Sequence, residues 1–481
     1  MSQLTATPVI TRGFFLDGKW MEAGEPIEIR SPYDQAVVGQ VFQGTREHAE
    51  AAIHAAVKAF RTTRRLPAFE RQRVLRRVAQ TIAERKQEFA RSIAQEAGKP
   101  IRAARTEVDR AIFTFTVAAE ESTRIYGEYL PLDWQEYAGG RWGIVRRFPL
   151  GPIVGISPFN FPLNLVAHKV APAIAAGCPI IVKPAPATPL TSLLLAEAVQ
   201  QAGWPDGGLN VVPLSNGDAG VLVSDDRIKL ISFTGSASIG WEIKRNSGKK
   251  KIILELGGNA GVIVHSDTDI AYAAERCVMG GFSYAGQSCI SVQRILVERP
   301  VYGEFLDLFV AGVAKLQTGD PLDESTDVGP LIREADAARA LDWVQEAVHG
   351  GARLLCGGKR QGSLLEPTVL TGTRPEMRVN CEEIFAPVVT VEAYDDMEAA
   401  IRTLNSSSYG LQAGIFTRDA KLLFHAYEEL EVGGLVAGDV PSFRIDHMPY
   451  GGLKDSGLGR EGLRYAIEEM TEPKLLVMNL R

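Results

Sequence analysis

The feature that most constrains the fold is a regular alternation that begins after Leu150, in which short apolar runs are separated by stretches of helical periodicity. The apolar runs lie at 153–156, 180–182, 209–212, 230–233 and 252–256, and the helical stretches at 163–176, 190–202, 219–224 and 238–246. Short, continuously apolar strands between helices are typical of a parallel sheet that is covered on both faces. We therefore expect a doubly wound α/β domain of the dinucleotide-binding type.

A second alternating stretch extends from about residue 259 to residue 416. Its expected strands are 261–264, 295–297, 387–391 and 413–416, and its expected helices are 271–280, 301–315 and 335–349. A chain of 481 residues is too long for one ordinary core. A second α/β domain of similar build is predicted, with the boundary near Gly257-Gly258.

Residues 70–98 are predicted to form one amphipathic surface helix, because apolar side chains recur there at helical spacing. Its arginines could be read as a nucleic-acid patch, but interleaved acids and a net charge of −6 favour a solvated face. The same charge gives no reason to expect an anionic membrane as partner. Residues 1–11 lack the features of a signal peptide, and no apolar run reaches the roughly 18 residues of a membrane span. We expect a cytoplasmic protein that binds small molecules.

The cysteines predict neither a disulfide framework nor a metal site. They are odd in number, scattered and without a CxxC pair, which indicates a reducing compartment. They are Cys178, Cys277, Cys289, Cys356 and Cys381. The glycosylation-type triplet at Asn405 is interpreted as an ordinary polar loop, since no secretion signal accompanies it.

A perfect GxGxxG occurs at Gly457, Gly459 and Gly462, but its context argues against a phosphate-binding fingerprint. Such a fingerprint needs a strand before it and a helix after it. Residues 449–456, with a proline and two glycines, cannot form a central strand. The motif is predicted to be a glycine-rich loop near the active site.

Seven short motifs carry the functional signal. In chain order they are Ser157-Pro158-Phe159-Asn160-Phe161-Pro162, Val182-Lys183-Pro184, Phe233-Thr234-Gly235-Ser236, Leu254-Glu255-Leu256-Gly257-Gly258-Asn259, Gly286-Gln287-Ser288-Cys289, Glu383-Ile384-Phe385-Ala386-Pro387 and Tyr450-Gly451-Gly452. With these residues the chain resembles the aldehyde dehydrogenase superfamily over essentially its whole length. The resemblance implies two Rossmann-like domains with a small β oligomerisation element, and NAD(P)-dependent oxidation of an aldehyde to the acid.

The resemblance also implies how the chain is divided. Residues 1–123 and 148–256 would form the dinucleotide-binding domain, with 440–463 returning to it, and 257–439 would form the catalytic domain. Residues 124–147 and 464–481 would be oligomerisation strands that cover sheet edges in a homodimer or homotetramer.

Cys289 is the candidate nucleophile, because an aldehyde must become tetrahedral before it can expel hydride and a thiolate adds readily. A lone cysteine is otherwise a buried packing residue, and an ordinary thiol is scarcely ionised at neutral pH, so an activating neighbour is expected. Asn160 and the Cys289 N–H are the expected oxyanion donors, although Asn160 would also serve as a helix cap before Leu163. Glu255, at the end of an apolar strand, is the expected general base for thioester hydrolysis, with a pKa raised by desolvation.

The remaining roles come from the resemblance. Lys169 and Glu472 would handle protons, although a structural role for each is an open alternative. Lys183 would contact the adenine ribose, Gly235 and Ser236 the pyrophosphate at a helix N-terminus, and Glu383 and Phe385 the nicotinamide riboside. Ser157, Pro158, Phe159, Pro186 and Gly257 would complete the cofactor site.

Two departures from the family pattern bear on the cofactor. Pro186 stands where NAD-preferring relatives often carry a glutamate, so nothing there would repel a 2′-phosphate. NAD or NADP is therefore expected, with a small preference for NAD. Ala386 replaces the usual glycine and is expected to crowd the nicotinamide side slightly.

The substrate clues are basic residues near the expected cavity. Arg444, together with Arg110 or Arg105 from a nearby helix, would suit a carboxylate or phosphate, although surface salt bridges would explain the same arginines. Phe161, Ser288, Ile290 and His447 are the other candidates. The hypothesis is a small hydroxylated or anionic aldehyde, of the lactaldehyde, glyceraldehyde phosphate, semialdehyde or phosphonoacetaldehyde kind.

Two alternatives remain. Acyl transfer to coenzyme A is disfavoured by the presence of Glu255, which CoA-acylating relatives lack. A catalytically silent structural or binding relative is disfavoured because Cys289, Asn160 and Glu255 are all retained.

Overall fold

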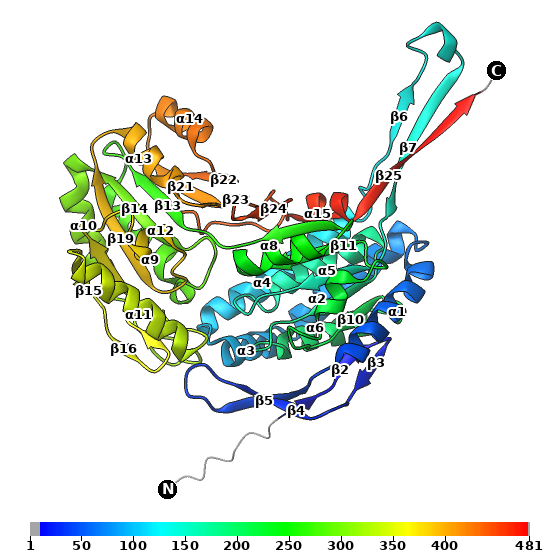
Figure 1. Ribbon diagram of the computed structural model, residues 1–481, viewed down its shortest axis with the longest axis horizontal. Helices are drawn as coiled ribbons and strands as arrows, with labels where there is room; N and C mark the ends of the chain where they lie inside the picture. Colours follow the sequence, from blue (N-terminus) through cyan, green and yellow to red (C-terminus); the bar gives the residue numbers. More distant parts are fainter. Residues whose placement is uncertain (1–9, 480–481) are drawn as a thin grey trace.

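An eight-stranded sheet forms the centre of the larger lobe in the computed structural model, which describes residues 10–479 (Figure 1). In spatial order its strands are β24 (Gly457–Leu458), β12 (Lys251–Glu255), β11 (Leu230–Thr234), β8 (Ile153–Ile156), β9 (Ile180–Lys183), β10 (Leu209–Val211), β2 (Phe14–Leu16) and β3 (Lys19–Met21). The five strands from β12 to β10 are parallel, and antiparallel strands flank them on both sides. Each expected apolar run forms one of these five strands.

Helices cover both faces of this sheet, as expected for a doubly wound fold. One face packs against α2 (Ala68–Glu84), α3 (Lys86–Ala97), α4 (Ile101–Glu121), α5 (Asn164–Ala176), α6 (Leu190–Gln201) and α15 (Leu463–Glu469). The other face packs against α1 (Arg46–Thr63), α7 (Gly220–Ser224) and α8 (Ala237–Asn246). Because both faces are covered, β8, β9, β10 and β11 are buried along their whole length.

The prediction of one continuous helix over residues 70–98 is wrong. The segment forms α2 and α3, separated at Arg85, whose backbone leaves the helical region. The pair is not only a surface element, because α2 packs against α4, α5 and α6. Arg71 of α2 reaches the carbonyl of Ala175.

A seven-stranded sheet forms the second lobe, with the order β15 (Arg353–Cys356), β18 (Thr368–Thr371), β19 (Val388–Tyr394), β14 (Val292–Glu298), β13 (Ala260–Val264), β21 (Gln412–Phe416) and β22 (Gly434–Ala437). All neighbours are parallel except β15 and β18. Its two faces are covered by α9 (Ile270–Phe282), α10 (Arg299–Val313) and α11 (Glu334–His349), and by α13 (Met397–Asn405) and α14 (Ala420–Glu429). The fold class is therefore the predicted one, and Gly257-Gly258 lies between strands of different sheets.

Smaller elements connect these layers. They are β1 (Thr11–Arg12), β4 (Pro26–Arg30), β5 (Val37–Phe42), β16 (Arg360–Gln361), β17 (Leu364–Leu365), α12 (Arg378–Cys381), β20 (Tyr409–Gly410) and β23 (Leu453–Lys454), with two 3₁₀ turns, η1 (Glu136–Ala138) and η2 (Ser283–Gly286). Within residues 10–479, no helix combines the length and apolar character that crossing a membrane requires.

Three antiparallel strands form an arm that projects from the larger lobe (Figure 1). They are β6 (Glu128–Pro131), β7 (Arg141–Pro149) and β25 (Thr471–Asn479). The expected arm segments, 124–147 and 464–481, differ from these bounds. Most of 464–470 belongs to α15, which packs on α4 and α5 because Leu463, Ala466 and Ile467 are buried there, and β7 continues to Pro149. Residues 480–481 of the expected arm, and residues 1–9 of the expected dinucleotide-binding domain, lie outside the described residues.

Candidate active site

A cavity of about 1100 Å³ lies at the carboxyl ends of the parallel strands, between the two lobes. Most of the predicted site residues line it, whereas Lys169, Glu472, Arg105 and His447 do not. Those that line it are Arg110, Ser157, Pro158, Phe159, Asn160, Phe161, Lys183, Pro186, Gly235, Ser236, Glu255, Gly257, Ser288, Cys289, Ile290, Glu383, Phe385 and Arg444. Residues far apart in sequence meet there because most of them end or follow a strand or lie on a loop facing the sheet, while Arg110 comes from α4.

Cys289 lies on a loop whose shape is fixed by unusual backbone and a buried amide. Tyr284 and Ala285 have φ near +50°, a region that costs free energy for residues with a side chain. The buried Gln287 side chain ties the loop to its surroundings by donating to the Pro330 carbonyl (3.2 Å) and accepting from the Ile332 N–H (2.9 Å). Gly286 has φ +70°, and a Cβ there would lie 2.2 Å from the Ala386 carbonyl, so only glycine permits this approach. The Gly-Gln-Ser lead-in therefore shapes the loop that presents the sulfur.

The Cys289 thiol is half-buried, and its Sγ lies 3.1 Å from the Tyr450 hydroxyl. Burial raises the pKa of Cys289 to about 12, and the Tyr450 hydrogen bond opposes this rise. The negative charge of Glu255 raises the Cys289 pKa further. The activating neighbour that the sequence led us to expect is therefore not a preformed cation beside the sulfur, and the thiol needs a base when it reacts.

Asn160 follows β8 and points toward the same loop. Its Nδ2 donates to the Gln287 carbonyl (2.9 Å), which leaves the second N–H of the amide for another acceptor. The cap of α5 is supplied instead by Glu107, whose carboxylate accepts from the N–H groups of Leu163 (2.9 Å) and Asn164 (3.1 Å). The helix-cap alternative for Asn160 is thus excluded. Within residues 10–479, the Cys289 N–H makes no hydrogen bond, so it too has a free donor.

Glu255 ends β12 and is 2% exposed. Within residues 10–479, neither of its carboxylate oxygens has a hydrogen-bond partner, although both are buried. Burial, reinforced by the negative charge of Glu461, raises the pKa of Glu255 well above its usual value. A buried carboxyl with a raised pKa and free oxygens can act as a general base near neutral pH.

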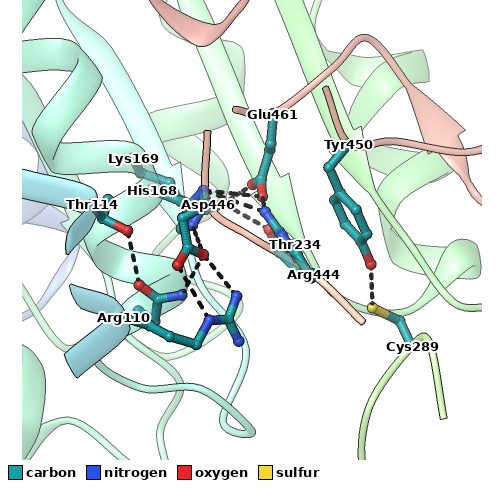
Figure 2. A network of polar contacts seen from close by, with 11 residues as sticks. Arg110, Thr114, His168, Lys169, Thr234, Cys289, Arg444, Asp446, Tyr450 and Glu461 are labelled. Atoms are coloured by element: carbon teal, nitrogen blue, oxygen red, sulfur yellow. Dashed lines mark hydrogen bonds and ion pairs between the residues drawn. The ribbon is translucent and has the colours of Figure 1, made fainter. Parts of the chain in front are cut away.

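The resemblance suggested Lys169 and Glu472 as a pair that handles protons, and for Glu472 this prediction is wrong. Lys169 on α5 is fully buried, and its Nζ donates to Thr234 Oγ1 (2.6 Å) and approaches Glu461 Oε1 (3.4 Å) (Figure 2). Glu472 lies on the arm, is half exposed and pairs with Lys251 (2.7 Å). Glu461, in the loop that carries the GxGxxG, occupies the place expected for Glu472. Gly457 of that motif pairs with Glu255 at the sheet edge, so the loop borders the active site.

The arginine candidates separate clearly. Arg110 and Arg444 line the cavity, whereas Arg105 pairs with Glu324 (2.6 Å) on the surface. His447 is exposed, packs edge-on against Phe113 and does not line the cavity. The Arg444 guanidinium stacks 3.6 Å from the Tyr450 ring centroid and donates to Glu461 (2.8 Å). Of the basic residues proposed to bind substrate, Arg110 and Arg444 therefore face the cavity, and Arg105 and His447 do not.

One end of the cavity is suited to the adenosine part of a dinucleotide. Lys183 ends β9, and its Nζ donates to Asn216 (3.0 Å). Burial lowers the pKa of Lys183. Ser236 precedes α8 without a side-chain cap, so the first N–H groups of that helix remain available to an anion. Pro186 lines this end, as the sequence suggested.

The other end is suited to the nicotinamide riboside. Glu383 accepts the Gly258 N–H (2.9 Å), and burial raises the pKa of Glu383 to about 7. A Cβ on Gly257 would lie 2.3 Å from the Glu383 carboxylate, so glycine keeps this acceptor accessible. The rings of Phe159 and Phe385 meet edge-to-face with centroids 6.0 Å apart. Together with the open N-terminus of α8, these residues fit a nicotinamide dinucleotide.

Ala386 does not crowd the nicotinamide side, contrary to expectation. Its side chain is buried in the core of the second lobe and does not line the cavity. The part of Ala386 that approaches the Cys289 loop is its backbone carbonyl, which lies against Gly286.

Sequence reasoning missed four residues that shape the site. Tyr450 appeared only as part of a motif, and Glu461 was hidden inside the misleading GxGxxG. His168 and Asp446 gave no signal, because a single histidine in a helix and a single aspartate in a loop are ordinary. Asp446 is two residues after Arg444 in the sequence. An acid so close to a predicted anion-binding arginine was the one available hint.

Comparisons with known proteins show which proteins the sequence and the fold resemble. The model of the aldehyde dehydrogenase family matches residues 20–476. The 3-sulfolactaldehyde dehydrogenase of Priestia megaterium is 41% identical over 475 residues, covering 98% of this chain and 99% of that protein. Aldehyde dehydrogenase 21 from Physcomitrella patens, solved with the reaction product succinate, has a TM-score of 0.97 and 46% identity, covering 98% of this chain and 99% of that one. Glyceraldehyde-3-phosphate dehydrogenase from Methanocaldococcus jannaschii, complexed with NADP, has a TM-score of 0.92 and 40% identity over 95% of this chain and 100% of that one.

Proposed function

The chain belongs to the aldehyde dehydrogenase family and is an NAD(P)-dependent enzyme, and from this premise we propose that it oxidises a small anionic aldehyde to the carboxylic acid through a thioester on Cys289. The observation that carries the proposal is that Cys289, Asn160 and Glu255 line the same cavity as the groups suited to a dinucleotide. A catalytically silent relative would have no need of this combination.

The first step is attack of the Cys289 sulfur on the aldehyde carbon. Because burial raises the thiol pKa to about 12, the proton must leave as the bond forms. Glu255 is the acceptor that we assign, since its own raised pKa and free buried oxygens suit it to the task. The resulting oxyanion would accept from the free amide N–H of Asn160 and from the Cys289 N–H.

NAD or NADP, when bound, would supply the hydride acceptor for oxidation to the thioester level. Phe159, Glu383 and Phe385 would hold the nicotinamide riboside, and Lys183 and Ser236 the rest of the dinucleotide. Glu255, after releasing the thiol proton to solvent, would then take a proton from a water molecule that attacks the thioester. The departing Cys289 thiolate would receive that proton. Hydrolysis to the acid follows, and transfer to coenzyme A is not needed.

The substrate class rests on Arg110 and Arg444. Both line the same cavity as Cys289, and guanidinium groups suit carboxylate, sulfonate and phosphate. The relatives named above act on a sulfonated aldehyde, release succinate, or act on a phosphorylated aldehyde, which supports the same class for this chain. The product assay is formation of NADH or NADPH together with free acid from a panel of aldehydes.

The test compares a four-carbon aldehyde that carries a terminal carboxylate with butanal, which lacks it. Arg110→Met and Arg444→Met are expected to raise the KM for the carboxylate aldehyde by about 10- to 100-fold while changing the KM for butanal little. Arg105→Met is the matched control, because Arg105 lies on the same helix as Arg110 but pairs with Glu324 outside the cavity. Equal KM values for the two aldehydes in the parent enzyme would overturn the substrate class.

We also propose that the arm mediates a homodimer or homotetramer. Strand β25 is an edge of its sheet, and its Leu475, Leu476 and Val477 are about half exposed. A long edge strand with exposed apolar side chains is a surface that another chain can cover. A second copy of this chain is the partner that we assign.

A further inference from the structure

Two buried residues behind the cavity wall take no part in the chemistry just described. His168 lies on α5 and Asp446 on the loop between β22 and β23, and they are 3% and 2% exposed. Neither lines the cavity, yet Figure 2 shows them in contact with the two arginines that do. A buried acid and a buried histidine at this place call for a physical reason, because burying polar groups costs free energy.

Asp446 holds Arg110 in a two-point contact. Asp446 Oδ1 accepts from Arg110 Nη2 (2.7 Å) and Oδ2 accepts from Arg110 Nε (3.2 Å). Oδ1 also accepts from Asn164 Nδ2 (3.0 Å) and contacts His168 Nε2 (2.8 Å). Such a paired contact fixes the plane of the guanidinium and leaves Arg110 Nη1 free of partners among the described residues.

His168 continues the chain of contacts to Arg444. Its Nδ1 lies 3.3 Å from Arg444 Nη2, which can only donate, so Nδ1 accepts and the ring proton sits on Nε2, facing Asp446. Burial and the charge of Arg444 lower the pKa of His168, so the imidazole is neutral. Arg444 Nη2 also donates to Glu461, while its buried Nε has no partner within residues 10–479.

The charges of this cluster leave room for an anion. Arg110, Lys169 and Arg444 face the carboxylates of Asp446 and Glu461. The remaining carboxyl is Glu255, whose pKa is raised, and while Glu255 holds a proton one positive charge of the cluster has no counterpart. An anionic substrate group beside Arg110 and Arg444 would therefore complete the balance.

We propose that Asp446 and His168 are positioning residues that link Arg110 to Arg444, so that the two guanidinium groups act as one preorganised site for the anionic end of the substrate. The proposal rests on the proposed function and deepens it. Arginine side chains are flexible, and a fixed mutual position removes part of the ordering cost of binding. The bridge thus makes the enzyme selective for anionic aldehydes without touching them.

The experiment replaces His168 by phenylalanine, which keeps the ring and removes both hydrogen bonds. KM and kcat are measured with the carboxylate aldehyde and with butanal. The expected result is a rise of about tenfold or more in KM for the carboxylate aldehyde, with kcat within a few-fold and the KM for butanal unchanged. Val170→Ala on the same helix is the matched control, because Val170 is buried in core packing alone, and it should leave the selectivity unchanged.

His168→Gln provides a second variant should the phenylalanine protein fail to fold. Its amide can still donate toward Asp446 but offers no acceptor at the place of Nδ1, so a smaller selective rise in KM, about threefold, is expected. KM values that change equally for both aldehydes, or for neither, would overturn the bridge while leaving the proposed function intact. A parent enzyme without preference for the anionic aldehyde would overturn the substrate class and the bridge with it.

Discussion

Replacing Glu255 by glutamine removes a base from the cavity while nearly preserving its volume. Glu255 is 2% exposed, and its oxygens have no partner within residues 10–479 whose loss would disturb the fold. The amide cannot take a proton from water. We expect steady-state turnover to fall by about 10²- to 10⁴-fold, the usual contribution of a general base.

The kinetic form of this loss is more informative than its size. Water can take the thiol proton slowly in place of Glu255, whereas hydrolysis of the thioester loses its base. NADH or NADPH should therefore appear in a slowed burst of about one equivalent per active site and then nearly stop. Stopped-flow absorbance measures the burst, and mass spectrometry of the quenched protein should find the acyl group on Cys289. Because the parent needs the ionised carboxylate, its hydrolytic rate should rise with pH through the raised pKa of Glu255.

Protein stability supplies an independent check of the direction in which the pKa of Glu255 is shifted. The pKa of Glu255 is higher in the folded than in the unfolded protein, so folding favours the protonated form. This contribution is complete below the ordinary pKa of a glutamate and is lost as pH rises through the raised pKa. The parent should therefore lose thermal stability over that window relative to Glu255→Gln, and the two proteins should differ least at the acid end.

Three results would refute the reasoning. Steady-state turnover at the parental rate would show that Glu255 is not the base. Absence of any burst with a normally folded variant would place the main requirement for Glu255 at addition of the thiol and not at hydrolysis. Restoration of full turnover by coenzyme A, with a stoichiometric acyl-CoA product, would establish acyl transfer in place of hydrolysis.

Asn160→Leu should lower kcat by about 10²- to 10³-fold, with little change in dinucleotide affinity measured by fluorescence titration, and an unchanged kcat would contradict its oxyanion role. Pro186→Glu should raise the KM for NADP by tenfold or more through repulsion of the 2′-phosphate, while the KM for NAD serves as internal control. Equal increases in the KM for NADP and the KM for NAD would show that the adenosine end of the dinucleotide does not bind beside Pro186. Replacing Leu476 and Val477 together by glutamate should lower the molar mass measured by light scattering, with unchanged far-UV circular dichroism. An unchanged mass would exclude the arm as the subunit contact.

The strands and helices of both sheets were predictable because their signal is local. In β8, β9 and β11 every residue is buried, so each reads as a continuous apolar run between helical stretches. The errors arose where the local pattern was compatible with two structures. The periodicity of 70–98 continues through Arg85, although the backbone turns there, and α15 was assigned to the arm because its apolar face packs on helices distant in sequence.

The candidate site divides in the same way. Cys289, Asn160 and Glu255 were proposed from motifs, since each lies in a short segment whose neighbours are constrained by the loop or strand that carries it. Glu461 was missed in favour of Glu472, because which acid reaches Lys169 depends on how the loop after β24 folds across the edge of β12.

The order of residues along this chain was enough to specify the doubly wound sheets and to propose a nucleophile and its helpers, since burial and loop geometry leave local traces. The raised pKa of Cys289 and the linkage of Arg110 to Arg444 through Asp446 and His168 could not be read in that way. Both arise from solvent exclusion and from contacts between segments as many as 336 residues apart. Such effects depend on distances in space, which a linear pattern does not contain.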